Sequence, residues 1–418
     1  MADNSNLHSA KKAKNDEFYT RYCDIEAEMN AYVEYNKDVF RGKTILCPCD
    51  DPEWSNFTRY FAANFTRFGM KKLISTSYAK SASNRQMTIF EQNSPMYDVA
   101  KHETHGKVFI LTSDTNGNGI VDTDDIRFSD YLEGDGDFRS DEVTALRDEA
   151  DIIITNPPFS LFREFLAWIL EADKRFVILG SMNAITYKEV FPLLRDDSVW
   201  LGTTKPHEFI IPNDDGLVDM NGNDVQKFGN ICWYTNLDHG IRHKRLILDT
   251  MAHNLKFNKK LRKKLEKDYG KVEYPHYDNY DAIEVPFTEC IPSDYDGVMG
   301  VPISFMDKYN PNQFEIVAFR KGEDGKDLVF TREREREFSR TFESLCDSDT
   351  RTDEQSEGYE SAWEEYLRTN YDKKEKIEPI DLFYPIATNL KNGLMNDCTI
   401  NGKKTYVRML IRKRDGGN

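Results

Sequence analysis

The sequence predicts an α/β fold with a doubly wound, mostly parallel sheet, followed by a second domain of α+β character. Short apolar runs alternate with segments of helical periodicity over the first 240 residues, which is the pattern of a parallel sheet covered by helices. The composition changes near residue 240, where basic segments begin. A chain of 418 residues is also long enough for more than one domain. We therefore expect domains at 1–240 and 241–418.

Five apolar runs are expected to form the buried strands of this sheet, at residues 44–47, 72–75, 108–111, 151–155 and 176–179. Residues 55–68 and 160–173 repeat large apolar side chains every four positions, which predicts helices. The runs 199–202, 208–212 and 231–236 are predicted to close the same sheet. Ligands of such sheets bind beyond the carboxyl ends of the strands, so the residues that follow each strand are the first candidates for a site.

Composition excludes several classes of protein. The net charge of −16 excludes a wholly basic nucleic-acid coat protein, although local basic patches remain compatible with it. With 39% hydrophobic and 12% aromatic residues the chain is not disordered. Its seven cysteines form no C-x-x-C pair, which argues against a disulfide framework and a structural zinc site. Because no secretory signal or long apolar run is visible, we expect a cytoplasmic protein without a membrane span.

The second domain begins with a basic segment. Residues 256–271 contain eight Lys or Arg and two acids, and Phe257, Leu261 and Leu265 form an apolar stripe at helical spacing. The charged face is either simply solvated or contacts the phosphates of a nucleic acid. Its candidate phosphate ligands are Lys259, Lys260, Lys263 and Lys264. Further on, residues 341–365 hold nine acids and one Arg, which predicts a polar helix or flexible insertion within about 329–400.

The most informative motif follows the predicted strand 151–155. It consists of Asn156, Pro157, Pro158 and Phe159. Two prolines stop the strand and stiffen the turn, so that the Asn156 amide oxygen and the Pro157 carbonyl can accept hydrogen bonds from one amino group. The Phe159 ring offers a stacking face beside them. This arrangement suits a planar amine whose nitrogen attacks a methyl group.

An acidic loop at 114–125 resembles the twelve-residue calcium loop. Its oxygen-bearing positions are Asp114, Asn116, Asn118, the Ile120 carbonyl, Asp122 and Asp125, and Gly119 stands where such loops turn sharply. The last position is Asp125, whereas Glu is usual. The loop is thus either a structural calcium site or an ordinary turn-rich acidic loop.

Several blocks of the chain together resemble the EcoRI-type adenine-specific DNA methyltransferases. These blocks are residues 14–20, 49–57, 134–140, 156–160, 277–282 and 296–302. The resemblance covers roughly residues 11–80, 130–325 and 400–414. It implies a fold that binds S-adenosylmethionine (SAM) in the first domain and recognises the DNA target with the second.

The resemblance also implies roles for individual residues. Phe18, Tyr19 and Thr20 correspond to a block that lies over SAM. Cys49, Asp50 and Asp51 follow the first predicted strand, where the methionine part of SAM is expected, although the usual glycine-rich turn is missing. Asp137 and Phe138 correspond to the block that holds the cofactor's adenine.

These observations predict a sequence-specific DNA adenine-N6 methyltransferase that flips its target adenine out of duplex DNA. The expected context is restriction–modification or the protection of genome or phage DNA, with a cognate endonuclease as a possible partner and a monomer favoured. The alternatives are an RNA or protein methyltransferase of the same fold and a non-catalytic protein that binds DNA or calcium.

Overall fold

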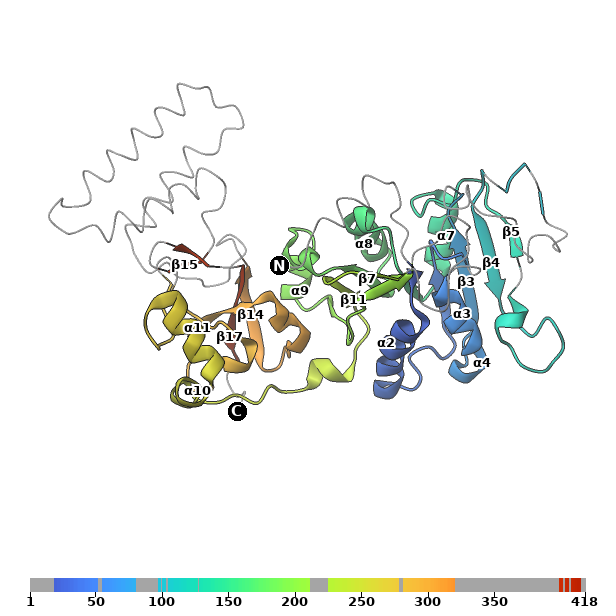
Figure 1. Ribbon diagram of the computed structural model, residues 1–418. Coiled ribbons are helices and arrows are strands. Elements are labelled where there is room, and N and C mark those ends of the chain that lie inside the picture. The colour runs from blue at the N-terminus through green and yellow to red at the C-terminus, as the bar shows by residue number, and fades with distance from the viewer. Residues whose placement is uncertain are drawn as a thin grey trace, which may run out of the picture. The chain divides into compact units, whose positions relative to one another are not determined.

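The computed structural model describes residues 19–51, 55–79, 97–98, 100–102, 104–126, 128–210, 225–277, 281–319, 398–400, 403–405 and 407–414. Phe18 and residues 329–397 of the predicted acidic insertion lie outside this set. The chain divides into two compact units, Met1–Arg242 and His243–Asn418. Figure 1 shows the ribbon of both units.

The first unit is built around a sheet of eight strands. In spatial order these are β5 (Phe128–Tyr131), β4 (Lys107–Leu111), β3 (Lys72–Ser77), β2 (Thr44–Cys47), β6 (Ile152–Thr155), β7 (Arg175–Ser181), β11 (Ile231–Thr235) and β8 (Trp200–Leu201). The four central strands β3, β2, β6 and β7 are parallel. Strands β4 and β11 run antiparallel to both of their neighbours. The sheet is therefore mixed with a parallel centre, which confirms the predicted α/β class.

The helices of this unit connect the strands. They are α2 (Tyr22–Tyr35), α3 (Asn56–Ala63), α4 (Phe65–Phe68), α7 (Asp141–Glu149), α8 (Phe162–Glu171) and α9 (Phe191–Arg195), with 3₁₀ turns at Thr123–Asp125, Phe159–Leu161, Met182–Thr186 and Gly240–His243. The single helix expected at 55–68 is divided at Asn64, whose backbone leaves the helical region. The Asn64 side-chain amide donates to the Tyr60 carbonyl, which completes the last turn of α3.

Helices cover both faces of the sheet. Trp233 of β11 packs against Phe57 of α3, with 6.0 Å between ring centroids. The next residue of the strand, Tyr234, packs against Phe162 of α8 at 5.0 Å. Since successive side chains of a strand point to opposite faces, α3 and α8 lie on opposite sides of the sheet. This is the doubly wound arrangement that the alternation of strands and helices predicts.

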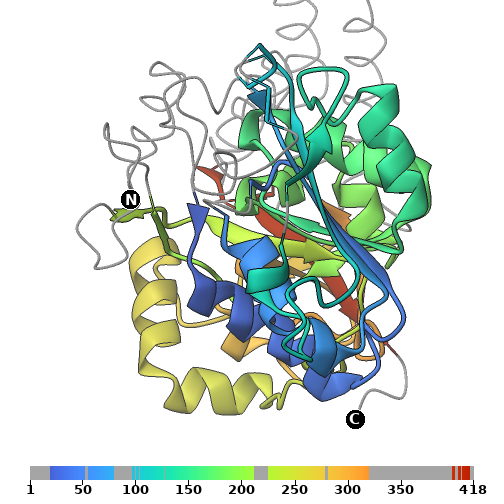
Figure 2. The ribbon, with the colours of Figure 1, turned by 90° about the vertical axis from the view of Figure 1, so that its right-hand side faces the viewer.

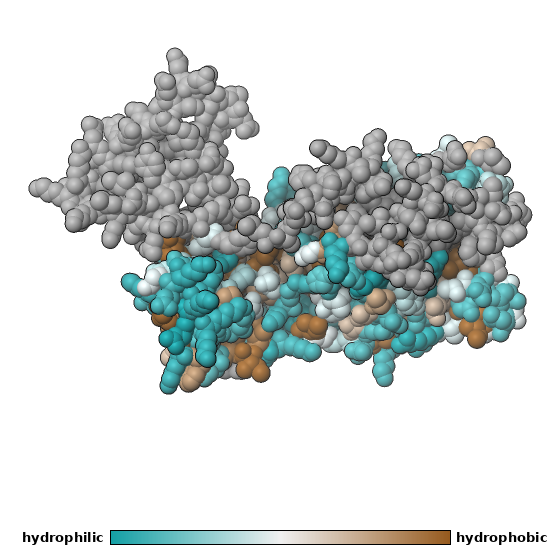
Figure 3. Space-filling view, viewed as in Figure 1, coloured by the Kyte–Doolittle hydropathy of each residue, from teal (hydrophilic) through white to brown (hydrophobic). Residues whose placement is uncertain are grey.

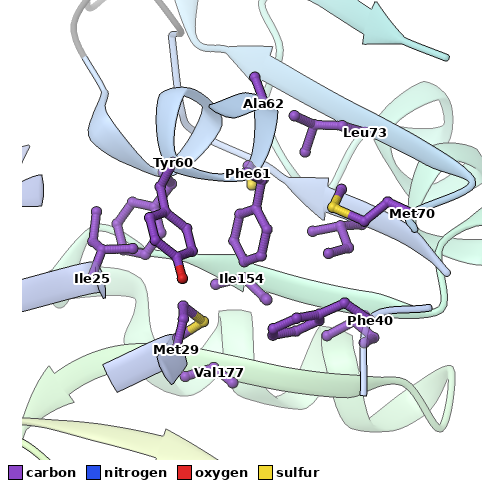
Figure 4. Packing of buried hydrophobic residues seen from close by; sticks show 14 of the residues in the cluster. Ile25, Met29, Phe40, Tyr60, Phe61, Ala62, Met70, Leu73, Ile154 and Val177 are labelled. Atoms are coloured by element: carbon purple, nitrogen blue, oxygen red, sulfur yellow. The ribbon is translucent and has the colours of Figure 1, made fainter. Parts of the chain in front are cut away.

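One face of the sheet carries the larger apolar core. Figure 4 shows Ile25 and Met29 of α2 and Phe61 of α3 packed over Ile154 of β6 and Val177 of β7. All five side chains are fully buried. The core therefore fixes α2 and α3 directly above the parallel centre of the sheet.

A small second sheet in this unit corrects one prediction. It consists of β1 (Tyr19–Thr20), β9 (Glu208–Ile210) and β10 (Val225–Lys227), all antiparallel. The expectation that 208–212 closes the main sheet is wrong. The preceding loop is tied to α2 instead, because the buried Glu28 carboxylate accepts hydrogen bonds from the backbone and hydroxyl groups of Thr203 and Thr204. Strand β9 therefore pairs with β1.

The second unit combines helices α10 (Met251–Phe257) and α11 (Lys259–Tyr269) with a mixed sheet. The order of strands in this sheet is β12 (Ala282–Glu284), β13 (Val298–Pro302), β17 (Arg408–Lys413) and β14 (Phe314–Phe319). Strands β15 (Thr399–Ile400) and β16 (Lys403–Lys404) form a separate two-stranded sheet. Two 3₁₀ turns lie at Thr288–Cys290 and Ile303–Lys308. The helix expected at 256–271 is divided at Asn258, whose side chain accepts from the Leu261 amide and caps α11. Figure 2 shows α10 and α11 meeting at this corner.

The core of the second unit contains a charged pair. Glu284 of β12 is fully buried, and Arg408 of β17 forms a bidentate ion pair with it, 2.6 and 3.0 Å from its oxygens. The Tyr277 hydroxyl donates to the same carboxylate at 2.5 Å.

In the part of the chain that the structure describes, every helix is too short or too polar to cross a lipid bilayer.

Candidate active site

The strand order places a candidate site at the carboxyl ends of β2 and β6. From β2 the chain continues to β3 on one side, whereas β6 pairs with β2 on the other side. Such a reversal of strand order opens a crevice at the carboxyl edge, where ligands of open α/β sheets bind. Two segments meet there, the first turn (residues 48–51) after β2 and the second turn (residues 156–159) after β6.

The first turn adopts a conformation that glycine usually supplies. Cys49 has a φ of 64°, in the left-handed region that side chains with a Cβ rarely enter. The turn is also fixed to β3, because the Asp50 amide donates to the Thr76 carbonyl at 2.7 Å and the Ser75 hydroxyl donates to the Asp50 carbonyl. The missing glycine-rich turn is thus replaced by a strained cysteine, which is a frequent feature of functional sites.

Asp50 and Asp51 are both buried in this turn. The Asp50 carboxylate accepts hydrogen bonds from the Ser55 hydroxyl and, at 2.9 Å, from the Thr155 hydroxyl. Burial raises the pKa of the Asp50 carboxyl to about 7. The Asp51 carbonyl accepts from the Ser55 amide at 2.6 Å, which joins the turn to the start of α3.

The second turn leaves β6 through Asn156. Pro157 is buried, whereas Asn156, Pro158 and Phe159 are half-buried. Phe159 packs against the large apolar core while remaining only partly buried. The Asn156 Oδ1 atom is buried and accepts no hydrogen bond from the residues that the structure describes, although Asn156 has other interactions. The turn therefore carries a half-buried amide side chain and a half-buried aromatic side chain at the carboxyl end of β6.

Strand β1 lies beside the first turn. The Asn56 side-chain amide, at the start of α3, donates to the Thr20 carbonyl at 2.8 Å. Thr20 is buried and Tyr19 is half-buried. The structure thus links Thr20 to the start of α3, next to Ser55, whose amide is bonded to Asp51 of the first turn.

The loop that contains Asp137 and Phe138 lies at the carboxyl end of β3. The Ala79 amide donates to the Asp135 carbonyl at 2.8 Å, and Gly136 approaches so closely that a Cβ there would lie 2.2 Å from the Ser77 carbonyl oxygen. The Phe138 ring is buried, with Phe165 at 5.0 Å and Trp168 at 5.6 Å between centroids. Any contact of Phe138 with a ligand at this edge must therefore come from its backbone.

The Asp137 carboxylate at the same position has a cationic partner. The Arg139 guanidinium donates to it through two nitrogens, at 2.6 and 2.9 Å. Arg139 also contacts Glu164 of α8 at 2.9 Å. The side chain of Asp137 is therefore held in place at the edge of the sheet.

Sequence reasoning missed the hydroxyl residues of this site. Thr155 is the last residue of β6, and its hydroxyl contacts Pro48 and Asp50 of the first turn. Ser55 caps α3 by accepting from the Phe57 amide. Ser55 could have been found as an N-cap signal before a helix. Thr155 carries no such signal, because its partners depend on how two distant strands pair.

The acidic loop at 114–125 does not gather its carboxylates around one point. Asp114 accepts from the Gly117 and Gly119 amides, at 2.6 Å each. Asp125 Oδ1 accepts three hydrogen bonds, from the Thr115 amide and hydroxyl and the Asn116 amide. Among residues that the structure describes, no three His, Cys, Asp or Glu side chains are placed to hold a metal ion. The structure therefore gives the calcium prediction no support.

The four candidate lysines of α11 fall into two groups, those with an acidic partner and those without one in the described part of the chain. Lys260 contacts Glu289 at 3.3 Å and lies over the Phe287 ring, and Lys264 pairs with Asp268. Lys259 and Lys263 are exposed, and neither has an ion pair within the described part of the chain. Figure 3 shows hydrophilic side chains gathered over this helix. The helix packs inward through Leu261 and Leu265.

Comparison with known proteins identifies relatives. A family model described as the adenine-specific methyltransferase EcoRI matches residues 6–414. The chain is 43% identical over 337 residues to the type II methyltransferase M.EcoRI of Escherichia coli, which covers 78% of this chain and 93% of that protein. It is 33% identical over 321 residues to M.MgeORF184P of Mycoplasma genitalium (74% and 85% covered) and 31% over 324 residues to M.MpnI of Mycoplasma pneumoniae (74% and 84%). No solved structure matches the chain.

Proposed function

Because this chain belongs to the EcoRI family of adenine-specific methyltransferases, we propose that the crevice between the first and second turns transfers a methyl group from SAM to the N6 nitrogen of adenine. The chain is a type II adenine-specific DNA methyltransferase, so its substrate is an adenine in DNA rather than a protein side chain. The observation that carries the proposal is the position of Asn156, Pro157, Pro158 and Phe159 at the carboxyl end of β6, beside the first turn.

Each residue of the second turn has a separate role in this proposal. The target adenine is extruded from duplex DNA and stacks on the accessible part of Phe159. Its amino hydrogens are donated to the Asn156 side-chain oxygen and the Pro157 carbonyl, which turns the nitrogen lone pair toward the methyl group. Pro158 stiffens the backbone that holds both acceptors.

SAM supplies an electrophilic methyl group when it is bound. In that reaction the adenine nitrogen would use its lone pair to bond the methyl carbon, the electrons of the carbon–sulfur bond would stay on sulfur, and the cationic nitrogen would then release a proton. That nitrogen is acidic enough to lose its proton to water, so no general base is required.

The residues proposed to hold SAM surround the same edge of the sheet. The left-handed first turn brings its backbone close to the crevice as a glycine turn would, which suits the methionine part of SAM. Tyr19 and Thr20, together with Phe18 before them, would lie over the cofactor. Asp137 and the backbone of Phe138 would hold its adenine ring, at the place where Gly136 permits close approach.

The remaining proposals concern the second unit and the cellular context of the enzyme. We propose that residues 241–418 recognise the DNA target, that exposed lysines of α11 contact phosphates, and that the protein acts as a cytoplasmic monomer. A cognate endonuclease that cuts the same site would complete a restriction–modification system, and a phage-encoded enzyme would instead protect phage DNA.

The central experiment replaces the acceptor. Asn156→Ala is expected to lower kcat by about 10²–10³, because the hydrogen bond strengthens as the nitrogen gains charge in the transition state. SAM affinity is expected to stay unchanged, because Asn156 faces the base. Phe159→Ala should cost roughly 1–3 kcal/mol of adenine stacking, whereas Phe159→Trp should retain much of the activity.

The measurement is single-turnover methyl transfer to duplex DNA, with SAM binding measured by calorimetry. Duplex RNA of the same sequence is the control substrate. A wild-type rate for Asn156→Ala, or a product methylated on cytosine, would contradict the proposal.

Calcium binding by the 114–125 loop is a separate proposal that rests on the spacing of its oxygen-bearing side chains. An ion would require the side-chain oxygens of the loop to converge at distances of about 2.3–2.6 Å. Millimolar calcium is then expected to raise the Tm, whereas sodium at equal ionic strength should not. An unchanged Tm leaves the loop as a structural turn.

A further inference from the structure

Thr155 joins the two turns of the active site. It is the last residue of β6, is fully buried, and directly precedes Asn156. Its hydroxyl lies 2.6 Å from the Pro48 carbonyl oxygen and 2.9 Å from Asp50 Oδ2. Both partners belong to the first turn, on either side of Cys49, so one side chain connects the two segments that the reaction must bring together.

Asp50 is a rigid anchor for this contact. Its amide donates to the Thr76 carbonyl at 2.7 Å, and its carbonyl accepts from the Ser75 hydroxyl. Ser75 is held in turn by the Thr58 hydroxyl of α3 at 2.8 Å. The backbone of Asp50 is thus held by β3, and its carboxyl has a second partner besides Thr155 in the Ser55 hydroxyl at the start of α3.

The Thr155 hydroxyl is shared between two oxygen atoms of the first turn. The Thr155 hydroxyl has one hydrogen and two acceptors within reach, the Pro48 carbonyl and the Asp50 carboxyl. In the described part of the chain no ion pair offsets the charge of this buried carboxyl. The hydroxyl therefore donates to either of two oxygens that lie on opposite sides of Cys49, and both oxygens hold the end of β6 against the first turn.

We infer that Thr155 is a positioning residue that, with Asp50, sets the second turn at a fixed distance from the first turn. The inference rests on the proposed function, because it assigns the methyl donor to the first turn and the methyl acceptor to the second. A displacement of about 1 Å between reacting groups lowers a rate about 10²-fold, so losing this contact affects the chemical step more than binding.

The matched variants are Thr155→Val and Thr155→Ser in the full chain. Valine keeps the shape and loses the hydroxyl, whereas serine keeps the hydroxyl. Thr155→Val is expected to slow single-turnover methyl transfer by about 10- to 100-fold, on the scale of a misplaced reacting group. Thr155→Ser should stay within about threefold of wild type, and both variants should bind SAM as the wild type does.

The outcomes separate this inference from the proposed function. A wild-type rate for Thr155→Val, equal losses in both variants, or a loss explained by weaker SAM binding overturns the positioning role. If these results coincide with an inactive Asn156→Ala, the proposed function stands and only the positioning role of Thr155 is rejected. A fully active Asn156→Ala instead removes the proposed function itself.

A second variant covers the case in which Thr155→Val does not fold. Thr155→Ala removes the same hydroxyl with a smaller side chain, so it should slow single-turnover methyl transfer as Thr155→Val would and bind SAM as the wild type does. Equal rates for Thr155→Ala and Thr155→Ser would overturn the inference.

Discussion

At the scale of single residues, Asp50 links the charge of the site to its stability. Burial raises the pKa of this carboxyl to about 7, hydrogen bonds from Ser55 and Thr155 offset part of the rise, and the neighbouring Asp51 carboxylate adds to it. The unfolded chain releases the proton near pH 4. Between these values the folded protein holds a proton that the unfolded chain has lost.

This difference predicts a pH dependence. The free energy of unfolding should fall as pH rises from about 4 to about 7, and the contribution of Asp50 should level off above that range. Asp50→Asn removes the titrating group. The measurement is urea unfolding of both proteins between pH 5 and 8, where the wild type should lose stability relative to the variant. Parallel profiles would show that Asp50 is already ionised in the folded state.

Much of the second turn could be predicted from residues alone. Asn156 and Phe159 follow an apolar strand, and two prolines restrict the backbone between strand and ring. Thr155 and Asp50 could not be paired in the same way, because residues 105 positions apart in sequence meet only once β2 and β6 are neighbours. Phe138 shows the converse, since its sequence block resembles a ligand site while its ring fills the core beside α8.

At the scale of elements, buried parallel strands were the easiest to predict. Strands β2, β6 and β7 are continuous apolar runs because both of their faces are covered. The direction of β4 and the partner of β9 were not predictable, since both depend on where long connections lead. For β9 the deciding contact is Glu28 in α2, whose buried carboxylate holds the loop before the strand.

Helix α11 allows a test of DNA contacts with a control in the same helix. Lys259→Ala and Lys263→Ala should each weaken binding to all duplexes alike and reduce the slope of log K against log salt by about one. Lys264→Ala should change the slope less, because Lys264 already pairs with Asp268. The measurement is a salt titration of duplex binding by fluorescence anisotropy. Equal slopes for all three variants and the wild type would leave this face merely solvated.

At the scale of the whole molecule, the residues proposed to hold SAM and the buried ion pair belong to different units. Arg408→Met leaves Glu284 buried without its cation, which should cost the second unit about 3–5 kcal/mol. The nearby Arg412→Met breaks a partly exposed pair with Glu315 and should cost no more than about 1 kcal/mol. Arg408→Met should therefore weaken DNA binding while SAM affinity stays unchanged.

Calorimetry of SAM binding, DNA binding and thermal unfolding of both variants would check this prediction. A parallel loss of SAM affinity in folded Arg408→Met would contradict the proposed division of labour between residues 1–240 and 241–418.

The left-handed Cys49 has a consequence for how the gene can evolve. A residue with a Cβ in this conformation costs about 1–2 kcal/mol, which glycine would largely remove. Cysteine and glycine codons differ by a single base, so relief of the strain is one point mutation away. Stabilising changes of this kind are readily sampled and are often neutral or costly for function. The frequency of Cys49→Gly after selection for DNA modification, compared with selection for folded protein alone, measures what the thiol contributes beyond the shape of the turn.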